Sequence, residues 1–322
     1  MHSLRKKIEQ LHVLVIGDVM LDTYAWGVVE RKSPEAPVDI LRVLQKTYRA
    51  GGAANVALNL RSLGVSVSLA GITGTDASAN RLSEILNESK VGAACLMCCD
   101  GRITTEKQRL IDGSRHLLRS DYETTEELNE PDTNRFLKLI TEQIERCHFN
   151  AVILQDYNKG VFNKYVIERL LALCRSKGIP VSVDPKKNHF FEYTGVHLFK
   201  PNWKETIEAL QLWDNTNADA INAADAAAQL LAKLEAENVL ITLSAKGMYY
   251  KSISAEHGHI PVRSSNVIDV SGAGDTVIAT CTAALAAGCT LKEAADLANI
   301  AASIVCEEAG VVTVNADRLF NS

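Results

Sequence analysis

A short glycine-rich segment near the end of the chain carries the strongest chemical pattern in the sequence. It spans residues 269–276, reads DVSGAGDT, and opens a stretch of helical period that runs to about Ala287. Two glycines one residue apart let neighbouring backbone amides converge, and the start of a helix adds partial positive charge. The segment therefore predicts a cradle for an anion such as a phosphoryl group in transfer. The carboxylate of Asp275 stands beside this cradle, where it can accept a proton from an attacking hydroxyl group.

Other kinds of glycine-rich turn fit this segment less completely. A bare Gly-x-Gly-Asp also arises where an aspartate occupies the first turn of a helix after a tight turn, and such short motifs are weak alone. The sequence contains no G-x-x-x-x-G-K-[ST] phosphate loop, and the segment lacks the third glycine of a dinucleotide-binding fingerprint. A dinucleotide-dependent oxidoreductase is therefore disfavoured.

Short apolar runs alternate along the chain with longer segments of helical period. The runs that predict buried strands are 13–16, 67–72, 151–154, 180–183, 196–199 and 239–243. The segments that predict helices are 135–147, 163–177, 222–235 and 291–306, with Asn163 as an N-cap and Gly178 as a stop signal. Repeated strand–helix–strand units indicate an α/β protein with a mostly parallel sheet and helices on both faces.

Polar side chains follow several of these strands. Asp18 comes after the first strand, and Lys159 and Lys186 come after two strands in the middle of the chain. Open α/β sheets bind ligands at the carboxyl ends of their strands, so these side chains are expected to face one crevice. The carboxylate of Asp18 can accept two sugar hydroxyl groups there, although a turn-capping aspartate is the alternative.

Two stretches, 23–43 and 96–118, do not follow the alternation. The first contains two prolines and an alternating segment at 38–43, and the second contains a strand-like segment at 103–110 between two glycines. Both are too long for plain loops in a compact domain. We therefore expect them to pair as a small β-layer inserted in a single domain of residues 1–322. Such a layer would act as a lid or as the surface of a homodimer that covers open strand edges.

The composition excludes several classes of function. Of the 322 residues, 47% are hydrophobic and 23% are charged, which is ordinary for a globular protein. The net charge of −5 offers no general attraction to nucleic acid or to an anionic membrane surface. The charge-free stretch 276–291 is too short to span a bilayer, and the N-terminus has no apolar signal core. The eight cysteines show no zinc-site spacing, so we expect a cytoplasmic protein with reduced thiols.

Three motifs together resemble the ribokinase/PfkB-type sugar kinases. Residues 269–275 resemble the D-T-x-G-A-G-D signature of that family, with Val270 in place of the usual threonine. The Gly-Gly segment at 51–57 resembles the element that opens a helix against the sugar, and residues 202–205 resemble the N-x-x-E motif that arranges Mg²⁺ and its waters. The resemblance covers essentially the whole chain. It implies an ATP-dependent carbohydrate kinase with a three-layer α/β/α sandwich and a small β lid.

A narrower resemblance is to the bacterial heptose-phosphate kinases. It rests on residues 17–22, 33–38, 156–160 and 184–186. It implies transfer of the γ-phosphate of ATP to the anomeric hydroxyl of D-glycero-β-D-manno-heptose 7-phosphate, for the synthesis of ADP-heptose and lipopolysaccharide core. Asp39 and the segment 114–119 depart from that pattern, so ribose, fructose or a fructose phosphate remains an alternative substrate. A catalytically silent sugar- or nucleotide-binding regulator is a further alternative. Many relatives carry an adenylyltransferase; the chain ends at Ser322, so we expect a stand-alone kinase.

The resemblance also implies a role for individual residues. The catalytic residues are Asp275 as the base and Gly272, Ala273 and Gly274 as the anion cradle. The substrate-binding residues are Asp18, Asp22, Gly51, Gly52, Asn55, Arg109, Arg115, Lys159 and Lys186, with Arg119 as a further candidate for the sugar phosphate. The nucleotide-binding residues are Ser244, Gly247, Ser271 and Asn299, and Asn202 and Glu205 hold Mg²⁺ through water. Asp269 and the backbone carbonyls of 306–310 are candidate ligands of a monovalent cation such as K⁺. Lys186 can alternatively reach the ATP phosphates, and a solvated lid face is an equal alternative for the arginines.

Overall fold

The core of the protein is a nine-stranded sheet of order β13-β12-β11-β10-β9-β8-β1-β4-β5. The computed structural model describes residues 1–212, 219–263 and 266–321. The strands of this main sheet are β1 (His12–Gly17), β4 (Ser66–Thr73), β5 (Gly92–Cys98), β8 (Ala151–Gln155), β9 (Val181–Asp184), β10 (Leu198–Phe199), β11 (Asn238–Thr242), β12 (Met248–Ser252) and β13 (His257–Ile260). Seven neighbouring strands of this sheet are parallel to one another: β11, β10, β9, β8, β1, β4 and β5. Strands β12 and β13 are antiparallel additions at one edge.

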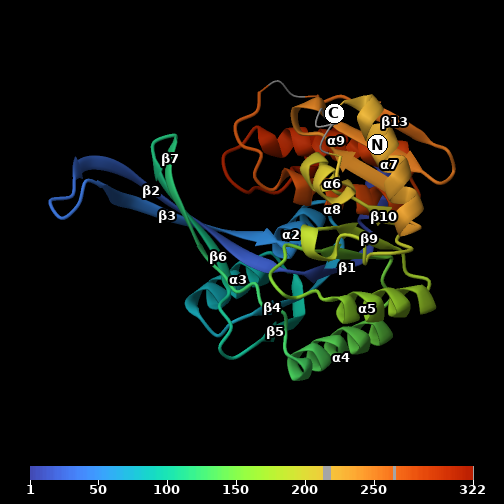
Figure 1. The fold of residues 1–322 in the computed structure, drawn as a ribbon, viewed down its shortest axis with the longest axis horizontal. Helices are drawn as coiled ribbons and strands as arrows, with labels where there is room; N and C mark the ends of the chain where they lie inside the picture. Colours follow the sequence, from blue (N-terminus) through green and yellow to red (C-terminus); the bar gives the residue numbers. More distant parts are fainter. Residues whose placement is uncertain (213–218, 264–265, 322) are drawn as a thin grey trace.

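Helices cover both faces of the main sheet, so the expected α/β layers are confirmed (Figure 1). The described helices are α1 (His2–Ile8), α2 (Ala53–Ser62), α3 (Ala77–Glu88), α4 (Glu130–Arg146), α5 (Lys164–Ser176), α6 (Trp203–Leu210), α7 (Ala220–Leu234), α8 (Ala273–Ala286), α9 (Leu291–Cys306) and α10 (Ala316–Asn321). Apolar side chains of α2, α8 and α9 pack in one core cluster, and those of α4, α5 and α7 pack in another. The predicted N-cap is present, because the side chain of Asn163 accepts a hydrogen bond from the amide of Val166 at 2.9 Å.

The strand predictions succeed where an apolar run is buried on both faces. All six predicted runs fall in the main sheet, although the 196–199 run contributes only β10 (Leu198–Phe199). The edge strands β5, β12 and β13 were not predicted. These edge segments contain charged, polar or glycine residues, and the resulting weak apolar pattern conceals them.

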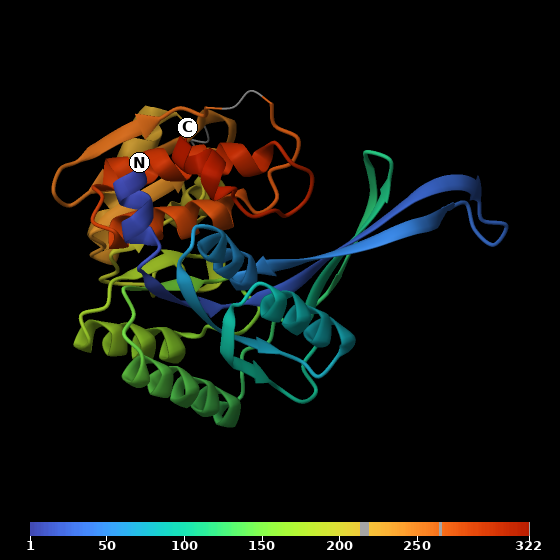
Figure 2. The same cartoon turned by 180° about the vertical axis from the view of Figure 1, so that it is seen from behind.

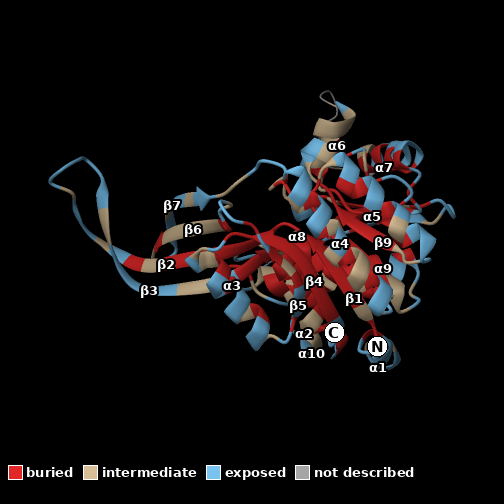
Figure 3. Cartoon of the chain, turned by 90° about the horizontal axis from the view of Figure 1, so that it is seen from below, coloured by how far each residue is buried: buried red, intermediate tan, exposed pale blue. Residues whose placement is uncertain are grey.

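A second sheet projects from the main one as a long arm (Figures 1 and 2). Its order is β3-β2-β6-β7, and its strands are β2 (Val19–Lys32), β3 (Asp39–Gly52), β6 (Thr105–Asp112) and β7 (Arg115–Tyr122). We call these four strands the lid. The lid is wider than the expected stretch 23–43, and the expected stretch 96–118 begins too early because 96–98 belongs to β5. Figure 3 shows that the lid is buried at its base and exposed at its far end.

The chain connections place a ligand site between β1 and β8. Strands β1 and β8 are parallel neighbours, but the chain leaves β1 towards β4 and β5 on one side and continues from β8 to β9, β10 and β11 on the other. Open α/β sheets bind ligands where the connections diverge in this way, at the carboxyl ends of the two strands, and we call this region the crevice. Asp18 and Tyr157 follow these ends. Within the described residues, none of the helices combines the length and apolar character that a bilayer crossing requires.

Candidate active site

The carboxylate of Asp275 lies at the centre of this crevice, in the first turn of α8. It is only 3% exposed, and it accepts hydrogen bonds from three side chains. Its Oδ2 atom accepts from Asn55 Nδ2 at 2.8 Å, and its Oδ1 atom accepts from Gln155 Nε2 at 3.0 Å and from the hydroxyl of Tyr157 at 2.8 Å. Two separate parts of the chain, α2 and the end of β8, therefore converge on this carboxylate of α8.

The protonation of Asp275 is set mainly by its burial. Burial raises the pKa of Asp275 to about 6, and the hydrogen bond from Asn55 and the positive charge of Lys200 oppose that rise. Burial also raises the pKa of Tyr157 well above its ordinary value, so the tyrosine keeps its proton and acts as a donor. The partial positive charge at the start of α8 favours the ionised form of Asp275 and would by itself make it a weak base. Because its pKa is nevertheless raised, the desolvation of the carboxylate outweighs this effect.

The start of α8 has the glycine turn expected of an anion cradle, but the amides without a protein acceptor differ from the expected set. Gly272 is the N-cap with φ of +79°, and a Cβ atom there would lie 2.8 Å from Asn55 Nδ2, so only glycine fits. The amide of Ser271 donates to Asp269 and the amide of Ala273 donates to the carbonyl of Val270, so neither is free for a ligand. Within the described residues, no hydrogen bond satisfies the amides of Gly272, Gly274 and Asp275.

Asp18 shapes the crevice through the loop that follows β8. Its carboxylate accepts hydrogen bonds from the backbone amides of Tyr157 at 2.7 Å, Lys159 at 3.1 Å and Val161 at 3.4 Å. The side chain is 1% exposed, and burial together with the negative charge of Asp156 raises its pKa. The three loop amides leave about one of the four lone-pair sites of the carboxylate, fewer than the two sugar hydroxyl groups expected to donate to it.

Asp22 lies at the base of the lid, where it is 3% exposed and paired with Arg109. A Cβ atom on Gly51 would lie 2.2 Å from Asp22 Oδ2, so the glycine makes room for this carboxylate. Gly52 has φ of +58° and caps α2, which begins with Asn55 in its first turn. The side-chain nitrogen Nδ2 of Asn55 donates a hydrogen bond to Asp275. The side-chain oxygen Oδ1 of Asn55 accepts a hydrogen bond from Asn59 at 3.1 Å. Asn55 therefore positions the carboxylate of Asp275, whereas the sequence suggested that it contacts the sugar.

The cations expected to hold a sugar phosphate are already paired with carboxylates. The pairs are Arg109 with Asp22, Arg115 with Asp112, Arg119 with Asp121, Lys159 with Glu123 and Lys186 with Glu205. Arg115 and Arg119 are largely exposed, which agrees with the alternative of a solvated lid face. Each pair lowers the attraction that its cation can offer to an incoming phosphate.

Lys107 is a cation of this crevice that the sequence did not single out. It lies on β6 of the lid, and its ammonium group is 5.2 Å from the centroid of the Tyr157 ring. Within the described residues it forms no ion pair, and burial lowers its pKa although Asp22 opposes that effect. The sequence did not identify Lys107 because β6 has mixed polarity, so its pattern does not show which residues face the crevice. Only the pairing of β6 within the lid fixes that orientation.

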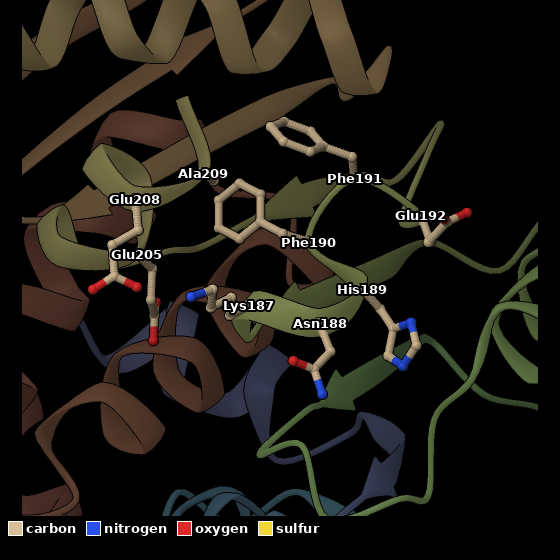
Figure 4. Close-up of a pocket in the computed structure, with 9 residues that line it drawn as sticks. All are labelled: Lys187, Asn188, His189, Phe190, Phe191, Glu192, Glu205, Glu208 and Ala209. Carbon is tan, nitrogen blue, oxygen red and sulfur yellow. The ribbon is translucent and has the colours of Figure 1, made fainter. Parts of the chain in front are cut away.

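The N-x-x-E motif forms a helix cap beside the same crevice. Asn202 Oδ1 accepts from the amide of Glu205 at 2.9 Å, and Glu205 Oε2 accepts from the amide of Asn202 at 2.8 Å. The other oxygen of Glu205 pairs with Lys186, whose ammonium also lies 5.1 Å from the Tyr157 ring centroid. Figure 4 shows a pocket beside this cap, between the 187–192 segment and α6, and Glu205 lines it.

The remaining nucleotide-side residues lie at the ends of neighbouring elements. Ser244 and Gly247 form the turn after β11, and Thr242 of that strand bridges to Asn202, so this turn adjoins the N-x-x-E cap. Asn299 is 3% exposed on α9, and its amide donates to the carbonyl of Pro261 at 2.8 Å. This bond holds the side chain of Asn299 against the backbone of Pro261, and its nucleotide-binding role stays a prediction.

Asp269 ties the cradle to the loop after α9. Its carboxylate accepts from the amides of Ser271 and Gly310, both at 2.9 Å. Burial disfavours the charged form, but these hydrogen bonds outweigh it and hold the pKa of Asp269 below its ordinary value. The carbonyl of Cys306, a second candidate cation ligand, accepts from the amides of Ile268 and Asp269. Asp269 and the carbonyl of Cys306, two of the candidate ligands of a monovalent cation, thus already accept hydrogen bonds from the protein.

Comparison with known proteins agrees with this geometry. Residues 10–318 match the pfkB family of carbohydrate kinases, and the chain belongs to that family. It is also similar in structure to phosphofructokinase-2 from Escherichia coli in complex with potassium, with a TM-score of 0.77 and 18% identity over 97% of each chain. Arabidopsis thaliana ribokinase complexed with ribose and ATP gives a TM-score of 0.73 at 17% identity, over 97% of this chain and 98% of that one. The family match identifies the chain as a carbohydrate kinase, and these two structures share its fold.

The curated relatives narrow the similarity further. The chain is 41% identical over 310 residues to the bifunctional protein HldE of Alcanivorax borkumensis, and 38% identical over 316 residues to that of Haemophilus influenzae strain PittEE. These matches cover 96% and 98% of this chain but 63% and 64% of the relatives. The chain thus spans slightly less than two thirds of the length of these bifunctional proteins.

Replacement of Asp275 by asparagine tests the base directly. The amide keeps the size of the side chain but cannot accept the proton, so kcat should fall by about 100-fold or more, while ATP and sugar still bind. Initial rates from a coupled ADP-release assay, with binding measured by calorimetry, check this expectation. A variant that turns over at the wild-type rate would remove the base role from Asp275.

Proposed function

We propose that this kinase phosphorylates the anomeric hydroxyl of D-glycero-β-D-manno-heptose 7-phosphate and produces the 1,7-bisphosphate used for ADP-heptose and lipopolysaccharide core. The sequence resemblance to heptose-phosphate kinases supports the sugar. The observation that carries the phosphosugar part is Lys107, a half-buried cation beside the Tyr157 ring with no carboxylate partner among the described residues. Only the kinase step is proposed for this chain. Ribose, fructose and a fructose phosphate remain the alternative acceptors.

The lone pairs of Asp275 define where the acceptor hydroxyl approaches. A carboxylate offers about four lone-pair sites. Oδ1 accepts two hydrogen bonds and Oδ2 accepts one, which leaves a site on Oδ2 for the attacking hydroxyl. With a pKa of about 6, Asp275 is ionised at neutral pH and still more basic than an exposed aspartate. It takes the proton as the new O–P bond forms.

Stabilisation of the transferring phosphoryl group falls to the start of α8. The amides of Gly272, Gly274 and Asp275 have no protein acceptor among the described residues and lie at the positive end of the helix. Phosphoryl transfer depends mostly on positioning and on charge stabilisation, which fixed amides supply without rearrangement. The lid closes over the acceptor and excludes water, which would otherwise receive the phosphoryl group.

Asn202 and Glu205 suit an outer-sphere Mg²⁺ site. Carboxylate and amide oxygens match the preference of Mg²⁺, and the ion usually keeps several waters. The oxygens of both side chains already accept hydrogen bonds within the cap, so contact through water fits them better than direct coordination. Mg²⁺ would neutralise charge between the phosphates of ATP. No catalytic step is assigned to a monovalent cation at Asp269, because its oxygens hold the cradle loop.

A panel of acceptor sugars tests the proposed substrate. Wild-type protein is assayed with heptose 7-phosphate, ribose, fructose, fructose 1-phosphate and fructose 6-phosphate, and phosphorus NMR locates the new phosphate. We expect the highest kcat/KM for heptose 7-phosphate, with the new phosphate on the anomeric carbon. Faster turnover of ribose or a fructose phosphate would replace the proposed substrate while leaving the sugar kinase class intact.

Lys107→Met tests the phosphate contact within that substrate. A charge-assisted hydrogen bond contributes roughly 1.5–3 kcal/mol, so KM for heptose 7-phosphate should rise about tenfold or more. KM for ATP and activity on heptose without the 7-phosphate should not change. Lys46→Met, which removes an exposed lysine from the lid strand β3, is the matched control. An unchanged KM for the phosphosugar, or an equal loss with the unphosphorylated sugar, would contradict the role of Lys107.

We also propose that two copies associate through their lids. Strands β3 and β7 are the edges of the lid sheet, and Leu44 and Leu118 on these strands are 61% and 59% exposed. Unpaired edges with apolar side chains favour association with another sheet.

We expect light scattering to give twice the 35.1 kDa mass of the chain for wild type, and a single mass for the double variant Leu44→Asp/Leu118→Asp. Ile253→Asp, which changes an apolar residue 69% exposed outside the lid, should leave the mass unchanged. A wild-type monomer would contradict the proposal.

A further inference from the structure

We propose that Lys200 is a positioning residue that controls the catalytic carboxylate Asp275 through Asp184 and Gln155. The proposal rests on the proposed role of Asp275 as the base. None of these three residues belongs to the cradle or to the N-x-x-E cap, and the sequence did not single out Gln155 or Lys200. Their arrangement carries the argument.

Lys200 and Asp184 form an ion pair that is almost completely removed from water. Their N···O distance is 3.1 Å, and their side chains are 3% and 5% exposed. Lys200 follows β10 and Asp184 ends β9, so two adjacent strands hold the pair at the carboxyl edge of the sheet. Buried ion pairs are costly to desolvate and are weak evidence for a purely stabilising role. A pair kept at this place therefore points to a task in the site.

Gln155 connects this ion pair to the base. The residue is fully buried at the end of β8, and its Nε2 atom donates to Asp184 Oδ2 and to Asp275 Oδ1, both at 3.0 Å. Both neighbours are acceptors, so the amide nitrogen must face them. The side-chain oxygen Oε1 of Gln155 is then left without a hydrogen bond, because it is buried with no partner among the described residues. Gln155 thus bridges two carboxylates through Nε2 while its Oε1 atom makes no hydrogen bond within the described residues.

The ion pair also adjoins the anion cradle. A Cβ atom on Gly274 would lie 3.8 Å from Lys200 Nζ and 4.0 Å from Asp184 Oδ2. The glycine backbone that presents a free amide to the phosphoryl group thus packs directly on the pair. One ammonium group therefore lies close to both the cradle backbone and the base.

The charges around Asp275 determine whether Lys200 raises or lowers the pKa of this carboxylate. Two kinds of group face Asp275 from the elements packed against it. The uncharged donors are Asn55 from α2, Gln155 at the end of β8 and Tyr157 after β8. The charged groups are Asp184 at the end of β9, Lys186 after β9 and Lys200 after β10. Asp184 raises the pKa of Asp275 and Lys200 lowers it. Lys186 is already paired with Glu205. Lys200 thus cancels the negative charge that Asp184 would otherwise impose on the base.

Three variants test the inference through the pH dependence of kcat/KM for heptose 7-phosphate, or for the panel sugar that replaces it. In Lys200→Met the acid limb should move to higher pH by about one unit, because the compensating charge is lost. In Asp184→Asn it should move to lower pH, since Lys200 then acts on Asp275 alone. In the double variant it should return close to the wild-type position. The phosphate of the sugar titrates in the same range, but it is common to all variants, so the differences between them are the readout.

The controls separate this inference from the proposed base and from general damage. Lys292→Met removes an exposed lysine that pairs with Asp296, and its acid limb should match that of wild type. If Lys200→Met does not fold, the downward shift in Asp184→Asn alone decides. An acid limb that does not move in a folded Lys200→Met or Asp184→Asn variant overturns the inference, whatever its effect on kcat. Full activity of Asp275→Asn would instead remove the base assignment itself.

Discussion

The burial of one carboxylate, Asp275, is the constraint on which the site depends. A carboxylate removed from water needs hydrogen-bond donors, and this one receives them from α2 and from the end of β8. Those elements meet only where the connections from β1 and β8 diverge and α8 begins. The cradle amides and the base therefore occupy one corner because the same fold feature produces both.

Charge balance organises the surroundings of that corner. Paired cations and carboxylates line the crevice, from Arg109 with Asp22 at the lid to Lys200 with Asp184 beneath the cradle. A chain with a net charge of −5 can thus hold several cations close to its base without a large local excess of positive charge. Against this background Lys107 differs, because it has no carboxylate partner among the described residues. A phosphorylated acceptor would supply the missing negative charge.

Local sequence was sufficient for the six buried runs of the main sheet and for the glycine-rich turn at the start of α8, because both depend on neighbouring residues. A buried run such as 13–16 shows its burial in its own composition, and the glycines of the cradle stand next to the base. The partners of these groups could not be predicted in the same way. Asn55 and Asp275 are 220 positions apart, so the sequence could not show that the side chain of Asn55 donates a hydrogen bond to Asp275, and it assigned Asn55 to the sugar instead. The lid bounds failed for a related reason, since β2 follows β1 with only Asp18 between them and no turn residue marks the change of sheet.

We propose that the start of α8 and Asp275 together hold the phosphoryl group during transfer. A crystal structure with ADP, Mg²⁺, the acceptor sugar and aluminium fluoride, a mimic of the transferring group, tests this proposal. The fluoride should lie against the amides of Gly272, Gly274 and Asp275, with the acceptor hydroxyl in hydrogen-bond contact with Asp275 Oδ2. Fluoride bound elsewhere in the crevice, or a sugar whose hydroxyl groups all lie away from Asp275, would contradict it.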